Sequence, residues 1–190
     1  MVWPPVFSPM IEAYLDRPRT EALLAQIDAI FFEASGTKSF PSAAARDAFR
    51  ERWLGRYLKH DPQHALLALQ SPGTASEVVA GYLVGAIDDP ARAPRFHDLG
   101  YFQNLQHLTA RYPAQLHVNL APGWRSVGIG RKLLEEFCAN ASALGAPGVH
   151  VFTGRGLRNV HFYARAGFEE VGSVTWNARE LVMLGRRLTA

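Results

Sequence analysis

The sequence predicts an α/β fold for this chain of 190 residues. Segments whose apolar residues recur at every second position, typical of strands, alternate with segments whose apolar residues recur every three or four positions, typical of helices. The length suits a single domain with a substantial core. No internal repeat, low-complexity tract or linker divides the sequence. We therefore expect one domain over residues 1–190.

The N-terminal part predicts a strand and two helices. Residues Val6 to Tyr14 can form a first edge strand, since the proline within this stretch is tolerated only at an edge. Thr20 is a suitable N-cap for a helix whose apolar stripe ends before Gly36. A second helix is expected to begin near Ser42 and to place four residues on one face: Ala45, Phe49, Trp53 and Tyr57.

Two strands and a long connection follow. Residues 64–69 and 78–87 are apolar runs separated by a Ser-Pro-Gly-Thr turn, which predicts a hairpin of antiparallel neighbours. The segment 91–113 is longer than an ordinary connection and is expected to contain a helix. Long connections often carry binding functions.

The C-terminal half predicts a strand over residues 116–120, a glycine-containing turn and a helix that begins at Ile129. The apolar stripe of that helix runs to Leu144, and Gly145 stops it. The remaining predicted elements are strands at 148–153, 170–176 and 180–188 and a short helix at 159–166.

The turn before this helix has the properties of an anion site. Gly128 and Gly130 lie where the helix begins, so unpaired backbone N–H groups face outward with no side chain above them. These donors and the helix dipole favour a phosphate, and Arg125 and Arg131 can add charge-assisted hydrogen bonds. The sequence excludes a P-loop, which needs Lys-Ser/Thr after its last glycine, and a dinucleotide fingerprint, which needs a glycine at Leu133.

Two motifs together identify a family resemblance. The turn, Arg125-x-x-Gly128-x-Gly130, resembles the R/Q-x-x-G-x-G/A signature with which GNAT N-acetyltransferases bind the pyrophosphate of acetyl-CoA. Further along, Phe162-Tyr163-x-x-x-Gly167-Phe168 resembles the family motif F-Y-x-x-x-G-F. The resemblance extends from about Leu23 to Leu188. The segment H-V-N-L-x-P at residues 117–122 resembles the corresponding segment of bacterial family members that are related to the acetyltransferase-like domain attached to some O-GlcNAc hydrolases.

The resemblance implies the GNAT fold and its donor. The expected sheet is mixed, mostly antiparallel, of about six to seven strands splayed at the central strand, with about four or five flanking helices. The implied acyl donor is acetyl-CoA, and no metal is implied. The residues expected to bind the coenzyme are Val118, Leu120, Arg125, Ser126, Val127, Gly128, Ile129, Gly130, Arg131, Asn159, Phe162 and Tyr163.

The implied reaction is direct attack of an amine on the acetyl carbonyl. The resemblance assigns the Leu120 N–H to the developing oxyanion and Tyr163 to protonation of the departing thiolate. His117 or Asn119 is the candidate for removing the amine proton, and a histidine suits this role because its pKa lies near working pH. Two departures are clear: Gly156 replaces the usual Asn of the family, and Ala114 replaces the carboxylate of some histone-acetylating members.

Several readings stay open at this stage. The acceptor is a small-molecule amine or a protein or peptide amino group, and the segment 91–113 is expected to border its site. The alternative function is a catalytically silent acyl-CoA-binding or interaction module. The glycines can also serve only as turn residues, and Tyr163 and His117 can be structural. The residues expected to contact the acceptor are Glu33, Ser35, Lys38, Phe96, His97 and Tyr101.

Composition restricts the remaining classes. Apolar residues make up 48% and charged residues 19%, and no apolar run approaches a membrane span. Twenty Lys and Arg against 17 Asp and Glu are spread along the chain, which does not favour nucleic acid. A single cysteine, Cys138, and the lack of a signal peptide predict a cytoplasmic protein, monomeric or homodimeric. No histidine spacing predicts a metal site.

Overall fold

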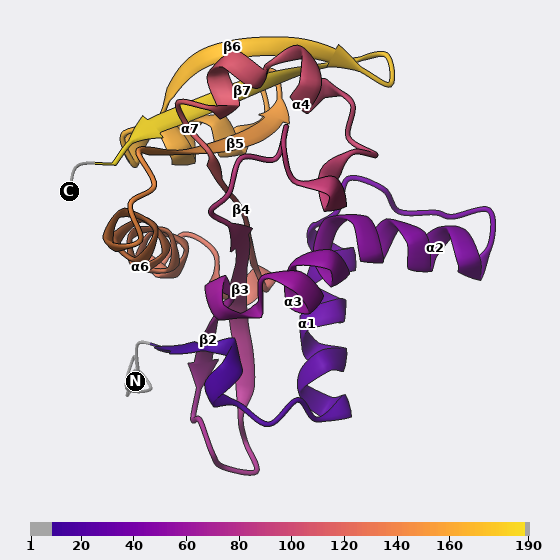
Figure 1. Ribbon diagram of the computed structural model, residues 1–190. Coiled ribbons are helices and arrows are strands. Elements are labelled where there is room, and N and C mark those ends of the chain that lie inside the picture. Colours follow the sequence, from indigo (N-terminus) through magenta and orange to yellow (C-terminus); the bar gives the residue numbers. More distant parts are fainter. Residues whose placement is uncertain (1–8, 189–190) are drawn as a thin grey trace. The chain divides into compact units, whose positions relative to one another are not determined.

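The computed structural model describes residues 9–188 and divides into two compact units. The first unit comprises the described residues up to Val84 together with residues 118–137. The second comprises residues 85–117 and the described residues from 138 onward. Figure 1 shows the helices and strands along the chain.

The first unit contains an antiparallel set of strands. Strand β1 (Met10–Ala13) pairs with β2 (Leu66–Gln70), which pairs with β3 (Val78–Ala86). The predicted first strand is thus confirmed over residues 10–13, whereas residues 6–8 lie outside the described part. Strand β4 (Ala114–Leu120) neighbours β3, and at its end the Ala121 N–H donates to the Ala80 carbonyl at 3.0 Å.

The backbones of β3 and β4 approach closely at Gly81. A Cβ atom at this position would lie 2.8 Å from the carbonyl oxygen of Asn119 and 3.2 Å from the Cα of Leu120. Side chains do not fit at these distances, so the contact requires glycine. The sequence at Gly81 therefore fixes how the end of β4 lies against β3.

Two capped helices accompany these strands in the first unit. Helix α1 (Glu21–Ala34) begins at Thr20, whose hydroxyl accepts a hydrogen bond from the Leu23 N–H at 3.1 Å. Helix α2 (Ala43–Arg50) begins in the same way at Ser42. Both predicted N-caps are confirmed. Helix α1 buries one face, formed by Leu23, Ile27, Ile30 and Phe31.

The predicted second helix continues beyond α2 with a change of pitch. A π-helical turn, Glu51–Gly55, connects α2 to α3 (Arg56–His60) without a break. Leu54 and Tyr57 are buried, whereas no residue of Ala43–Arg50 is. The 3₁₀ turn Pro62–His64 then separates His64 from the helix that ends at His60. These two histidines therefore do not share a helix face.

In the second unit, the start of β4 pairs in parallel with β5 (Gly148–Gly154) at Ala114 and Gln115. In the described residues, β4 and β5 pair at these two positions. A short pairing of this kind is expected of a central strand that splays from its neighbour. Strand β5 also pairs antiparallel with β7 (Arg179–Arg187), which pairs with β6 (Glu169–Trp176) in the long hairpin visible in Figure 1. Helix α7 (Arg158–Arg165) precedes β6.

The pairings give a seven-stranded order, β1-β2-β3-β4-β5-β7-β6. The predicted mixed and mostly antiparallel sheet is confirmed. The helix expected within 91–113 is confirmed as two short helices, α4 (Tyr101–Asn104) and α5 (Gln106–Thr109), which follow a 3₁₀ turn at Pro94–Phe96. Leu105 separates the last two because its ψ of 21° leaves the helical region.

Helix α6 (Ile129–Ala143) runs from the first unit into the second. Its apolar face is buried at Ile129, Leu133, Phe137 and Ala141, as predicted. The prediction for Leu144 was wrong, because the helix ends one residue earlier and this side chain is 61% exposed. Gly145 has a φ of +85°, which suits its role as the C-terminal stop.

Candidate functional site

The turn before α6 is open and has a left-handed backbone at two residues. Ser126 has a φ of +65° and Gly128 a φ of +88°. No atom lies within 4 Å of the place that a Cβ of Gly128 would occupy. The side chains of Arg125 and Val127 are exposed, whereas Ile129 and Gly130 are buried.

This geometry suits an anionic group. The first N–H groups of an α-helix have no acceptor within the helix, and the open space over Gly128 lets an anion approach them. Arg125 and Arg131 supply positive charge on each side of the turn, and Arg131 is exposed. These groups are donors of the kind that can bind an anion.

Arg125 is held by two contacts within the first unit. Its Nε donates to the carbonyl of Leu120 at 3.1 Å, and its Nη2 forms an ion pair with the carboxylate of Glu33. The two side chains of the pair are 41% and 43% exposed. A residue expected to bind phosphate and a residue expected to contact the acceptor thus contact each other.

The end of β4 carries the other residues predicted in this unit. Val118, Asn119 and Leu120 are half-buried. The Asn119 side-chain amide donates to the hydroxyl of Tyr82 at 2.9 Å. Burial raises the pKa of Tyr82, so its hydroxyl stays neutral and can accept this bond. Asn119 is thereby fixed in orientation by the neighbouring strand. His117, also half-buried, precedes these residues in the second unit.

Tyr163 lies on α7 in the second unit and is 6% exposed. Its ring packs against Phe162 and Phe168, with centroids 5.0 and 5.4 Å apart. Among the described residues, its hydroxyl makes no hydrogen bond. Burial raises the pKa of Tyr163, so the hydroxyl keeps its proton.

Asn159 stands at the start of α7 and is exposed. Its Oδ1 accepts a hydrogen bond from the hydroxyl of Thr153 at 2.7 Å. The amide oxygen of Asn159 is therefore engaged with Thr153, and the NH₂ group of Asn159 takes no part in this bond. Gly156, where the family usually has Asn, has a φ of +78°, a conformation that glycine adopts readily.

The six residues expected to contact the acceptor differ in exposure. Phe96 is fully buried and Tyr101 is 3% exposed, so both serve the core of the second unit. His97 is exposed. In the first unit, Ser35 accepts a bond from the Thr37 N–H at 3.0 Å, and Lys38 donates to the carbonyls of Phe32 and Glu33. Lys38 thus caps the end of α1.

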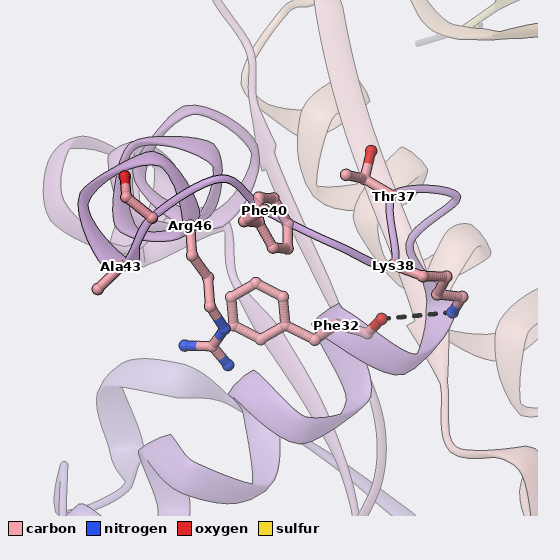
Figure 2. Close-up of a pocket in the computed structure, with 7 residues that line it drawn as sticks. Phe32, Thr37, Lys38, Phe40, Ala43 and Arg46 are labelled. Atoms are coloured by element: carbon pink, nitrogen blue, oxygen red, sulfur yellow. Dashed lines mark hydrogen bonds between the residues drawn. The ribbon is translucent and has the colours of Figure 1, made fainter.

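A pocket of about 420 Å³ opens at the same end of α1. Figure 2 shows the rings of Phe32 and Phe40 and the side chain of Arg46 around it, with Lys38 at one side. Lys38 is the lining residue that we predicted as a site residue from the sequence, and the others are new. Phe32 falls outside the buried face of α1, and Arg46 is one of several arginines on α2 and beyond, so no local pattern distinguishes them. The lining residues are Phe32, Thr37, Lys38, Phe40, Ser42, Ala43 and Arg46.

Within residues 9–188, no cluster of three His, Cys, Asp or Glu side chains could hold a metal ion. The same residues contain no helix that is long and apolar enough to cross a membrane. Cys138 is buried within α6.

Comparison with known proteins gives a family and a fold. The acetyltransferase (GNAT) family model matches residues 24–168. The crystal structure of SsHAT is 23% identical with a TM-score of 0.69, and the match covers 96% of this chain and 100% of that chain. The NatC complex bound to Gag peptide and CoA is 17% identical with a TM-score of 0.65, covering 96% and 100%. Naa20 of Chaetomium thermophilum, in complex with a bisubstrate analogue, is 18% identical with a TM-score of 0.60, covering 94% and 86%. These structures share the fold of this chain.

Proposed function

Since this chain belongs to the acetyltransferase (GNAT) family, we propose that it transfers the acetyl group of acetyl-CoA to a primary amine by direct attack within a ternary complex. The observation that carries the proposal is the turn from Arg125 to Gly130. It combines the open backbone at Gly128, the first N–H groups of α6 and two flanking arginines.

The proposed chemistry is an acyl transfer without a covalent enzyme intermediate. The amine nitrogen forms a bond to the acetyl carbon, and the carbon–sulfur bond breaks. The Leu120 N–H stabilises the oxyanion that develops on the carbonyl oxygen. Tyr163 gives its proton to the thiolate and becomes a tyrosinate, the amine gives up one proton, and return of one proton to Tyr163 restores the enzyme, so the products are the amide and the free thiol.

Tyr163 is the proposed acid because its hydroxyl carries a proton and no described side chain accepts that proton. Burial raises its pKa, which keeps the proton in place before the reaction and makes the group a weak acid, so the proton moves only to the departing thiolate. His117 is the proposed route for the amine proton, because the imidazole is basic near neutral pH and the Asn119 amide is not. Asn119 is also engaged with Tyr82.

The first test is calorimetric titration with acetyl-CoA of the wild type and the variants Arg125→Ala and Arg131→Ala. We expect micromolar binding, weakened about tenfold in at least one variant, as loss of a charge-assisted phosphate contact predicts. Arg92→Ala is the control, since this arginine is 84% exposed and lies outside the turn. Absence of binding would contradict the proposal.

The Glu33 pairing provides a second control. Arg125→Ala and Glu33→Gln both break the same ion pair. If Arg125 binds phosphate, only the arginine variant weakens acetyl-CoA binding, and Glu33→Gln leaves it unchanged or strengthens it. If both variants weaken acetyl-CoA binding equally, Arg125 has a structural role and does not contact the phosphate.

An amine screen with detection of the released thiol then tests transfer. Small amines and peptides with a free N-terminus or a lysine form its two arms, because both acceptor classes are open. Turnover with either arm supports the enzyme. Tight coenzyme binding without turnover on any amine would favour a silent acyl-CoA-binding module.

A further inference from the structure

We propose that the pocket at the end of α1 binds a small molecule that carries an aromatic ring and a carboxylate joined to the ring by a short chain. Its lining includes no residue of the turn at Arg125–Gly130, and the proposed binding does not depend on the proposed acetyl transfer. Its walls come from α1, the segment that follows it and the first turn of α2. The volume of about 420 Å³ lies in the range of small-molecule sites.

The aromatic wall is rigid and only partly covered. The rings of Phe32 and Phe40 lie 6.0 Å apart at 82°, and both side chains are half-buried. Phe49 contacts Phe40 at 5.2 Å and Phe31 at 5.5 Å, which joins the wall to the buried face of α1. A preformed wall of this kind favours a flat apolar group, because rings prefer edge or offset contact.

The cationic side of the pocket is Arg46. Its guanidinium carbon lies 3.6 Å from the centre of the Phe32 ring, as Figure 2 shows. Among the described residues, this ring contact is the interaction that the Arg46 guanidinium makes, with no carboxylate or carbonyl partner. A guanidinium stacked by its face keeps its N–H groups at the edge, where they match both oxygens of a carboxylate.

The charge of the lining favours a singly charged anion. The seven lining residues include no acidic side chain. Lys38 is the other cation, but its amino group already donates to the carbonyls of Phe32 and Glu33. One guanidinium edge therefore remains for the ligand, which suits a carboxylate better than a phosphate dianion. The hydroxyls of Thr37 and Ser42 add polar lining.

The test is titration of the full chain with 3-phenylpropionate, followed by saturation-transfer NMR and calorimetry. Neutral 3-phenylpropionamide, acetate and phenyl phosphate are the matched probes. We expect 3-phenylpropionate to bind with a dissociation constant below about 1 mM, and each of the three probes to bind about tenfold more weakly. If 3-phenylpropionamide binds as tightly as 3-phenylpropionate, the proposed contact between Arg46 and a carboxylate is wrong. If acetate binds as tightly, the proposed contact with the aromatic rings is wrong. If phenyl phosphate binds more tightly, the proposed preference for a carboxylate is wrong.

Variants locate the binding. Arg46→Gln is expected to weaken 3-phenylpropionate about tenfold, and Arg46→Lys to give an intermediate loss because the charge stays and the planar fork goes. Lys59→Gln, which removes an exposed charge of α3 outside the pocket, is the control. Thermal unfolding checks that each variant is folded, and Phe40→Leu provides an independent change in the wall. Unchanged binding in Arg46→Gln, or an equal loss in Lys59→Gln, would overturn the proposal.

Discussion

Tyr82 on β3 and Tyr163 on α7 are both buried, and burial raises the pKa of both hydroxyls. Their surroundings differ in one respect. Tyr82 accepts a hydrogen bond from Asn119, whereas the hydroxyl of Tyr163 has no hydrogen-bond partner among the described residues. Tyr82 therefore holds the Asn119 amide in the fold, whereas the hydroxyl of Tyr163 remains available to a ligand, as its proposed role as the acid requires.

The largest expected effect that tests this comparison is the loss of the Tyr163 hydroxyl. Tyr163→Phe should lower kcat about 100-fold or more, as removal of a general acid does, with little change in acetyl-CoA affinity. Thiol release gives kcat, and calorimetry gives the affinity. Because burial raises the pKa of Tyr163, we also expect that wild-type turnover shows no loss from ionisation of this tyrosine up to a pH of about 10. Unchanged turnover in the variant would remove Tyr163 from the chemistry.

His150 extends the comparison to a buried base of the second unit. It is fully buried, its Nδ1 donates to the carbonyl of Tyr112, and burial lowers its pKa to about 4. In the unfolded chain the pKa of a histidine is near 6.5. Between pH 6.5 and pH 4 the unfolded chain therefore binds more protons than the folded protein, so the free energy of unfolding falls as the pH decreases through this range. At pH 5 the loss should be about 2 kcal/mol.

Urea unfolding at pH 7.5 and pH 5 measures that loss. His150→Gln should reduce the difference between the two pH values, although the variant itself is less stable at both. His107→Gln, which changes an exposed histidine, should retain the wild-type difference. An equal pH dependence in wild type and His150→Gln would contradict the assignment.

The smallest expected effect concerns Tyr82. Tyr82→Phe removes the acceptor of the Asn119 amide, so it should destabilise the fold by about 1 kcal/mol while kcat falls less than tenfold. Urea unfolding and the thiol assay give the two numbers. A 100-fold loss of kcat here would erase the distinction between the two tyrosines.

The order of strands and helices could be predicted because its signals are local. Thr20 and Ser42 cap helices through bonds to residues three positions on, and Gly145 ends α6 through its own backbone angle. The two motifs at Arg125 and Phe162 are also contiguous in sequence. Such features can be recognised from a few neighbouring residues, without information on the rest of the chain.

The partners of the site residues could not be predicted, because they depend on tertiary register. Arg125 pairs with Glu33 across 92 positions, and Asn119 bonds to Tyr82 across 37. Phe96 reads as a loop aromatic in the sequence, yet it is fully buried. The pocket around Arg46 likewise arises from residues on two helices, and no spacing within either helix indicates it.

The π-helical turn Glu51–Gly55 has a consequence for insertions and deletions. A π turn accommodates one residue more than a regular helix, and each residue of an α-helix turns the chain by about 100°. Deleting one residue here would let α2 and α3 merge into a single regular helix. Because the π turn already absorbs the extra residue, the residues after such a deletion would keep their faces, and Tyr57 would stay in the interior. A deletion within α2 or α3 would instead rotate the residues after it by about 100°. This segment can therefore lose one residue at lower cost than the regular helices on either side of it.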